Sequence, residues 1–165
     1  MRPVTYSMNV SLDGFINDRE GSLDWSAPDP DVFRLWIEDI RNVGVHLMGR
    51  RLYETMLYWE TADQDPSLGE DERTWTALWK PLPKVVFSRT LSEVQGAARL
   101  ATGSVAEEIE RLRAEPCEGE IAIGGPTIAA QAAEHDLIDE YKAMVLPVMI
   151  GGGTPFFPRV DRQVK

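Results

Sequence analysis

The chain has 165 residues, of which 43% are hydrophobic and five are tryptophan, so one domain with a full core is expected and disorder is excluded. Seventeen basic against 27 acidic residues give a net charge of −10, which argues against nucleic acid and membranes as partners, because nucleic acid and anionic membranes both attract a basic surface. A single cysteine, Cys117, excludes an intrachain disulfide and a cysteine-based metal cluster, and with two widely separated histidines no metal site is expected.

The sequence shows no targeting or linker segment. No signal-peptide pattern follows the first residue, and no apolar run approaches the roughly 18 residues of a membrane-spanning helix. A cytoplasmic protein is therefore expected. Without internal repeats or low-complexity tracts, residues 1–165 are predicted to form a single domain.

The first predicted strand covers residues 4–10, in which apolar and polar side chains alternate loosely. It runs into Asp13 and Gly14, a dipeptide typical of turns. This turn is either a plain loop or a loop at the end of a strand, where open α/β sheets place their ligands. In the second case Asp13 would contact a substrate.

A helix is predicted to begin at Pro30, because proline suits the first helical position and Asp29 is a suitable N-cap. Asp31 lies in the first turn, beside the positive end of the helix, and its simplest role is to compensate the helix dipole. Apolar residues recur at helical spacing and form a core face, which consists of Phe33, Trp36, Ile37 and Ile40.

A second buried strand is predicted over residues 43–48, and Gly49 turns it into a helix that begins with Arg50 and Arg51. Two cations at a helix N-terminus oppose the helix dipole. A bound anion would remove this conflict through charge-assisted hydrogen bonds, whereas two solvated surface arginines are the alternative. His46, in the middle of the apolar strand, is interpreted as a core histidine.

The third predicted strand, residues 84–87, ends in Ser88, Arg89 and Thr90. Two hydroxyls and a cation at a strand end suit a phosphate monoester, although an ordinary polar loop can have the same composition. Residues 99–101 are predicted as a short strand, and residues 104–107 carry a capping-box pattern that begins the next helix.

A strand over residues 121–123 is followed by Gly124, Gly125 and Pro126, and then by a helix of small residues. Because proline occupies the first helical position, the helix N-terminus would present free N–H groups of the kind that bind phosphate. The alternative is a tight turn without a ligand, since the spacing of the dinucleotide fingerprint GxGxxG is absent.

Strands that alternate with helices predict an α/β fold with a mostly parallel sheet that is covered on both faces. The strand ends after residues 48, 87 and 123 carry glycine, arginine, serine or threonine. Three polar strand ends on one edge of such a sheet can bind a long cofactor with several phosphates. This combination is more specific than any single motif.

Three stretches, in this order and at this spacing, resemble the dihydrofolate reductase superfamily: residues 48–54, 87–90 and 123–125. Residues 8–16 most resemble the branch that includes the reductase domain of bacterial riboflavin biosynthesis, the RibD C-terminal domain. The resemblance covers nearly the whole chain and implies a three-layer αβα sandwich around a mostly parallel mixed sheet. It also implies NADPH as the hydride donor and a conjugated heterocycle as the acceptor.

The resemblance also implies a role for individual residues. Ser88 and Arg89 would face the adenosine 2′-phosphate and so favour NADPH over NADH. An acid is implied in the first turn of the helix after the Trp loop, and its candidates are Asp31 and Asp29. Asp13 and Trp25 would contact the substrate, with Trp25 closing a loop over the nicotinamide. Cofactor contacts are implied for Val10, Ile16, Gly49, Arg50, Arg51, Leu52, Ser88, Arg89, Thr90, Gly124, Gly125, Pro126, Thr127 and Ile128.

The sequence therefore predicts an NADPH-dependent reductase that acts on a pteridine or on a pyrimidine resembling a riboflavin precursor. The alternative is an α/β module that binds a nucleotide or a phosphorylated metabolite without turnover. Whether the chain forms a homodimer stays open. After residue 157 the family continues with an antiparallel closing segment, so the chain either stops short at Lys165 or leaves a sheet edge open.

Overall fold

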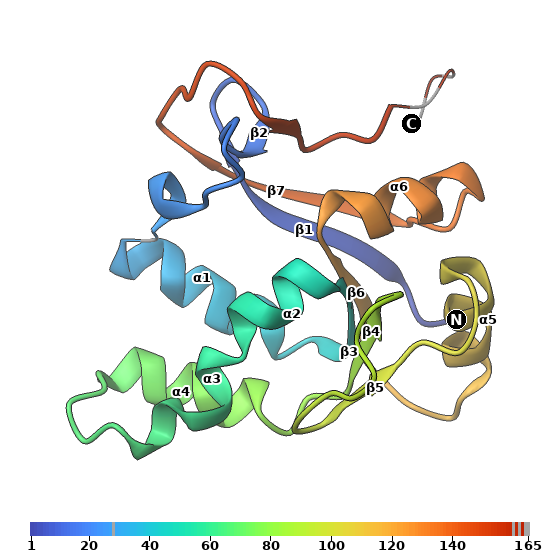
Figure 1. Ribbon diagram of the computed structural model, residues 1–165, viewed down its shortest axis with the longest axis horizontal. Helices are drawn as coiled ribbons and strands as arrows, with labels where there is room; N and C mark the ends of the chain where they lie inside the picture. The colour runs from blue at the N-terminus through green and yellow to red at the C-terminus, as the bar shows by residue number, and fades with distance from the viewer. Residues whose placement is uncertain (28, 160, 162, 164–165) are drawn as a thin grey trace.

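The computed structural model describes residues 1–27, 29–159, 161 and 163 (Figure 1). Its main sheet has six strands in the order β5-β4-β3-β6-β1-β7, and each neighbouring pair is parallel. The predicted α/β fold with a mostly parallel sheet is therefore confirmed. The strands are β1 (Val4–Ser11), β3 (Val43–Gly49), β4 (Lys84–Phe87), β5 (Ala98–Leu100), β6 (Glu120–Gly124) and β7 (Glu140–Leu146).

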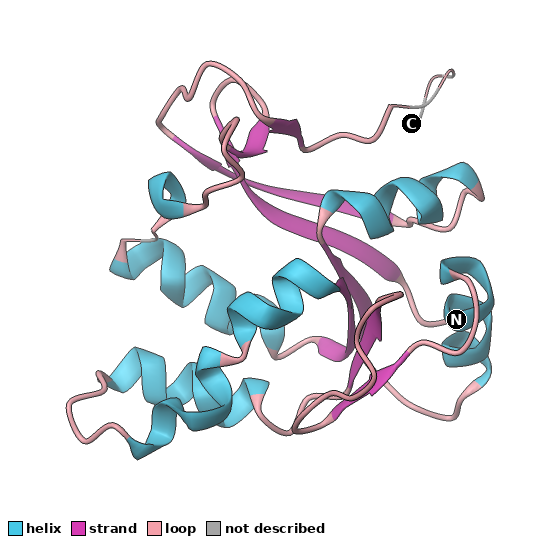
Figure 2. Cartoon of the chain, viewed as in Figure 1, coloured by secondary structure: helices cyan, strands magenta, loops and turns pink. Residues whose placement is uncertain are grey.

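Helices cover both faces of the sheet and give the predicted three-layer αβα sandwich (Figure 2). One layer contains α1 (Pro30–Ile40), α2 (Arg50–Met56) and α4 (Glu70–Trp79), and the other contains α5 (Val105–Ala114) and α6 (Pro126–Glu134). Shorter connections are formed by α3 (Tyr58–Thr61) and the 3-10 helices η1 (Asp24–Ser26) and η2 (Ala62–Gln64).

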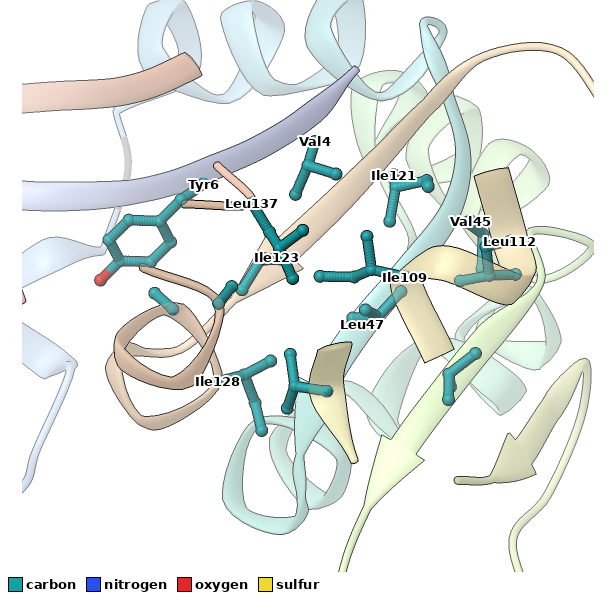
Figure 3. Packing of buried hydrophobic residues seen from close by; sticks show 14 of the residues in the cluster. Val4, Tyr6, Val45, Leu47, Ile109, Leu112, Ile121, Ile123, Ile128 and Leu137 are labelled. Carbon is teal, nitrogen blue, oxygen red and sulfur yellow. The ribbon is translucent and has the colours of Figure 1, made fainter. Parts of the chain in front are cut away.

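Side-chain alternation along the strands decides which residues meet which helical layer. In β6, Ile121 and Ile123 pack with Leu47 of β3 against α5 and α6, in the cluster of buried residues that Figure 3 shows. The intervening residues of β6, Ala122 and Gly124, face the opposite layer and line a pocket there. Ala122 has a small side chain, and Gly124 leaves room for the side chains of His46 and Leu52 in the pocket wall.

The helix starts predicted from the sequence are confirmed. The Asp29 carboxylate accepts hydrogen bonds from the backbone N–H groups of Asp31 and Val32, both at 3.0 Å. The Ser104 hydroxyl accepts from the Glu107 N–H at 3.2 Å, and the Glu107 carboxylate accepts from the Ser104 N–H at 2.7 Å. These caps involve residues within one helical turn, so the local sequence is sufficient to identify them.

Among the described residues, antiparallel pairing occurs outside the main sheet, between β2 (Phe15–Asn17) and β8 (Thr154–Pro155). At the edge of the main sheet, β7 pairs with β1 within the part of the chain that the structure describes. The expected chain end at Lys165 lies outside the described residues. Among the described helices, none has the length and apolar character needed to cross a membrane.

Candidate functional site

A cleft of about 790 Å³ runs along the carboxyl edge of the sheet, where four neighbouring strands end. Residues that follow β3, β4, β5 and β6 form its floor, and the β2–β8 ribbon contributes Ile16, Asn17 and Thr154 to its rim. The segments that line it at or after these strand ends are residues 49–52, 87–89, 103–105 and 125–128. The polar strand ends singled out in the sequence thus converge on one cleft.

The charge of the cleft is opposite to that of the chain. Arg50, Arg51 and Arg89 line it, and no carboxylate does so among the described lining residues, although the chain carries 27 acidic residues. Arg50 donates to Glu54 at 2.7 Å and to Thr90 at 2.8 Å. Neither Arg51 nor Arg89 forms an ion pair with a described residue. The cleft therefore attracts an anion of several charges.

Two glycines leave open space at the corners of the cleft. Gly125 is the N-cap of α6 with φ +95°, a left-handed conformation that favours glycine, and no side chain caps this helix end. Gly49 is the N-cap of α2 and also lacks a side-chain cap. A Cβ atom added at either glycine would meet no atom within 4 Å. Phosphate groups that approach the backbone closely would fit these corners.

The loop after β4 is held in shape by its own hydrogen bonds. The Ser88 hydroxyl accepts from the N–H groups of Thr90 at 3.2 Å and of Leu91 at 3.1 Å. Arg89 lies between Ser88 and Thr90 and is exposed at the cleft. Through the bond from Arg50 to Thr90, this loop is joined to the N-terminus of α2. Two of the three polar strand ends are thus fixed relative to one another.

A second cavity, an apolar pocket of about 250 Å³, adjoins the cleft on the face of α1 and α4. Four side chains line both cavities, so the pocket opens where these residues meet the cleft: Met8, Ile16, Leu23 and Leu52. Gly124 lies at this junction, where an added Cβ would collide with Leu52 and come within 2.6 Å of His46 Cε1. The absence of a side chain at Gly124 therefore lets His46 and Leu52 approach the end of β6.

His46 belongs to the pocket wall, which the interpretation as a core histidine did not anticipate. Burial and, to a lesser extent, the nearby charge of Lys84 lower the pKa of His46 to about 4. The Lys84 ammonium donates to the carbonyl oxygens of Trp79 at 2.6 Å and Leu82 at 2.9 Å. The rings of His46 and Trp79 form a T-shaped contact with centroids 5.3 Å apart. Because the pKa of His46 is about 4, its imidazole is uncharged at neutral pH.

Most of the residues expected to contact a cofactor lie together in the cleft, although their roles stay a prediction. Those that line it are Ile16, Gly49, Arg50, Arg51, Leu52, Ser88, Arg89, Gly125, Pro126, Thr127 and Ile128. Three others lie elsewhere. Val10 is buried in the core, Gly124 lines the pocket, and Thr90 accepts the hydrogen bond from Arg50.

The structure does not bring the expected acid to the pocket. Asp29 is occupied as the helix cap, and the Asp31 side chain is 91% exposed and pairs with Arg34 at 3.0 Å. Neither residue lines the cleft or the pocket. The carboxylate that does line the pocket, among the described residues, is Asp39, two turns further along α1.

The two expected substrate contacts, Asp13 and Trp25, also lie outside both cavities. Asp13 instead joins two loops, because its carboxylate accepts from the Ser11 hydroxyl at 2.6 Å and from the Gly151 N–H at 2.8 Å. These bonds hold the pKa of Asp13 below its usual value, with the Ser11 hydroxyl as the largest cause. Trp25 lies in η1, and Leu23, the N-cap of this 3-10 helix, lines both cavities.

Sequence reasoning missed part of the cleft. Gly103 and Ser104 follow β5 and line it, but the sequence pattern identified Ser104 only as a helix cap. The signal was present, since these residues form a fourth polar strand end on the same edge. Gln131 lies on the second turn of α6 and reaches the cleft without a sequence signal.

The chain belongs to the RibD C-terminal domain family, whose model matches residues 2–165. The fold is shared with a protein of Shewanella sp. PV-4 provisionally named for riboflavin biosynthesis, with 28% identity, a TM-score of 0.73 and coverage of 100% of this chain and 88% of that one. The uncharacterized protein YyaP of Bacillus subtilis (strain 168) is 27% identical over 166 residues, which cover 99% of this chain and 84% of YyaP.

Two enzymes of known name share the fold at lower identity. Dihydrofolate reductase from Enterococcus faecalis, in a complex with NADP(H), is 19% identical with a TM-score of 0.57 and coverage of 96% of this chain and 79% of that one. The diaminohydroxyphosphoribosylaminopyrimidine deaminase/5-amino-6-(5-phosphoribosylamino)uracil reductase of Thermotoga maritima is 17% identical, with a TM-score of 0.61 and coverage of 99% of this chain and 51% of that one. The predicted RibD-like branch is confirmed by the family model, and the predicted dihydrofolate reductase-like fold is confirmed by the solved structures.

Proposed function

We propose that this chain is an NADPH-dependent reductase that transfers a hydride to a heterocyclic small molecule, either a pteridine or a pyrimidine resembling a riboflavin precursor. One observation carries the proposal: the cationic cleft and the apolar pocket meet at four shared side chains. A dinucleotide bound along the cleft by its phosphates would have one ring at the mouth of the pocket. Membership of a reductase family and the fold shared with an NADP(H)-bound dihydrofolate reductase support this assignment.

The residues of the cleft fit the phosphates of NADPH. Gly49 and Gly125 leave space for the pyrophosphate, and the uncapped N-terminus of α6 offers backbone N–H donors beside it. Arg89, with the Ser88 loop behind it, would bind the adenosine 2′-phosphate. Arg51 would add a further cation at the start of α2. When bound, NADPH supplies the hydride, and the protein supplies the position of the acceptor.

The pocket would hold the ring that accepts the hydride. Its walls contain Phe33, Trp36, Trp59, Trp75 and Trp79, so a flat conjugated ring would be enclosed by aromatic surfaces. Enclosure of this kind removes water from the reacting ring and so prevents competing reactions. The neutral imidazole of His46 lies in the same wall and can donate or accept a hydrogen bond.

The second candidate function is a module that binds a nucleotide or a phosphorylated metabolite without turnover. It is favoured by the position of the acidic groups, since Asp29 and Asp31 lie outside the pocket. The pocket carboxylate, Asp39, is already paired with the Lys142 ammonium at 3.0 Å. Protonation of a reduced ring would then depend on solvent or on the ring itself.

The test is a titration of the purified protein with NADPH, followed by a search for heterocycle-dependent loss of NADPH absorbance. A dihydropterin and an aminouracil are the first two probes, and the double variant Arg51→Ala plus Arg89→Ala is the control for the cleft. We expect tight NADPH binding, loss of that binding in the variant, and oxidation with at least one probe. Binding without oxidation by any heterocycle would support the second function. Wild-type binding by the double variant would exclude the cleft as the cofactor site.

A further inference from the structure

The apolar pocket differs from the cleft in the charges that surround it. Among the described residues that line it there is no lysine or arginine, and its one carboxylate is Asp39. Lys142 donates to Asp39 at 3.0 Å and to Glu120 at 2.8 Å, and Thr5 donates to the same Glu120 oxygen at 3.1 Å. This network contains two carboxylates and one ammonium, so it leaves no cation for a ligand. An anionic group placed in the pocket would lose its hydration without gaining a counterion.

Lys84 lies behind the pocket wall but cannot serve as that cation. Its side chain is 2% exposed, and its ammonium is committed to the carbonyl oxygens of Trp79 and Leu82. The ammonium also lies 3.8 Å from Glu60 and 4.7 Å from the centre of the Trp79 ring. The indole of Trp79 lies in the pocket wall while the ammonium does not. Of the cleft and the pocket, only the cleft therefore has described cationic side chains in its lining.

The shape of the pocket is set by a cluster of aromatic rings. Ring centroids are 5.8 Å apart for Phe33 and Trp75, 6.1 Å for Phe33 and Trp59, and 5.7 Å for Trp75 and Trp79. These rings pack on one another from α1, α3 and α4, so none of them can move far without disturbing the others. The remaining volume of about 250 Å³ suits a flat ring system without a long substituent.

Four polar atoms in the pocket wall are buried and have no hydrogen-bond partner among the described residues: Ser7 Oγ, His46 Nδ1, Trp75 Nε1 and Trp79 Nε1. An indole N–H can only donate, and a hydroxyl can donate as well. A buried donor without an acceptor is unfavourable, so a ligand in the pocket would gain if one of its acceptors came within hydrogen-bond distance of such a donor. The other polar pair of the wall is complete, because the Trp36 N–H donates to Asn9 at 2.8 Å.

We infer that the substrate of the proposed reductase is a flat, uncharged heterocycle that carries carbonyl oxygens or ring nitrogens as acceptors and no phosphate or carboxylate tail. This inference rests on the proposed function and narrows its substrate class. In such a complex the ring would pack against the aromatic walls, and its acceptors would lie beside the unpartnered donors. The cofactor in the cleft would carry the negative charge of the complex. A phosphoribosyl pyrimidine, which gives the Thermotoga maritima reductase its name, is then the disfavoured member of the class.

The experiment compares two probes that share one ring: 5-amino-6-(ribosylamino)uracil and its 5′-phosphate. Binding of each to the protein saturated with NADP⁺ is followed by tryptophan emission, which reads the pocket whether or not the ring is reduced. Reduction of each is then followed by NADPH oxidation. We expect the compound without phosphate to bind at least tenfold more tightly and to have the higher kcat/KM if it is reduced.

The inference would be overturned if the phosphorylated compound bound as tightly as the unphosphorylated one or more tightly, or if neither compound bound. A different result would separate the two proposals. If neither compound caused NADPH oxidation but the unphosphorylated one bound more tightly, the proposed reductase activity would be refuted. The preference of the pocket for an uncharged ligand would still be supported.

A variant adds a second readout. Trp79→Phe keeps the aromatic wall but removes one unpartnered N–H. It should weaken binding of the unphosphorylated probe several-fold and leave NADPH affinity unchanged. Unchanged probe binding by both Trp79→Phe and Trp75→Phe would contradict the donor role of the indoles.

Discussion

Replacement of Gly49 by alanine separates the cofactor role of this residue from its structural role. Gly49 is the N-cap of α2 in an ordinary extended conformation, with φ −81° and ψ 173°, so alanine can adopt its backbone without strain. An added Cβ would meet nothing within 4 Å, because it would project into open space at a residue that lines the cleft. The methyl group should therefore affect a ligand much more than it affects the fold.

Two opposing terms set the change in the free energy of unfolding for Gly49→Ala. Alanine restricts the unfolded chain and so stabilises the protein by about 0.4–1 kcal/mol. Alanine is also a poorer N-cap than glycine, which we put at roughly 0.5–1 kcal/mol in the opposite direction. The sum is within about 0.5 kcal/mol of zero. If the pyrophosphate approaches this backbone, the methyl group should weaken NADPH binding at least tenfold, about 1.4 kcal/mol.

Gly69→Ala is the matched control. Gly69 is the N-cap of α4 with φ −67° and ψ 168°, and it lies outside the cleft. Its added Cβ would lie 3.1 Å from Glu72 Oε2, the end of a flexible side chain. Denaturant unfolding measures both stabilities, and NADPH titration of tryptophan emission measures both affinities. Wild-type NADPH affinity in a stably folded Gly49→Ala protein would show that no cofactor phosphate reaches this corner.

Three further predictions concern the specificity, packing and charge of the protein. Arg89→Ala should weaken NADPH binding about tenfold and NADH binding little. The reason is that the guanidinium of Arg89 would bind the 2′-phosphate, which NADH lacks. If titration showed that the binding of both cofactors is weakened equally, this role of Arg89 would be excluded. Gly124→Ala should lower the free energy of unfolding by about 1–3 kcal/mol, because its methyl would lie 2.6 Å from His46 Cε1; wild-type stability in denaturant would contradict this packing. Burial would raise the pKa of Glu108, but the hydrogen bond from Arg99 at 2.6 Å and other bonds and charges lower it to about 2, from an ordinary value of 4.5. The stabilisation from ionised Glu108 is therefore complete above about pH 4.5 and is lost as the pH falls towards about 2. Glu108→Gln should cost about 3 kcal/mol at pH 7 and less below pH 4.5; a difference that is independent of pH would refute this reasoning.

Local sequence was sufficient to predict an element wherever the interactions that determine it lie within a few residues. The N-cap at Asp29 and the capping box at Ser104 depend on bonds within one turn, and both were predicted. Continuous apolar runs identified the central strands for the same reason. The edge strand β7 was not predicted, because its burial alternates irregularly and Val145 is 56% exposed. A strand at an edge has solvent where a central strand has neighbours, so its sequence need not be apolar.

The sequence by itself determined the cleft in outline, because parallel strands place their carboxyl ends on one edge and those ends are marked by glycine, arginine and hydroxyl residues. The pocket was decided only by tertiary structure. Its walls join Ser7 of β1, His46 of β3 and Trp79 of α4, which are distant in sequence and have no shared motif. The packing of α1 likewise leaves the Asp31 side chain 91% exposed and outside the lining of the pocket. Sequence spacing specifies position along an element, but the packing of the elements specifies which side chains face one another.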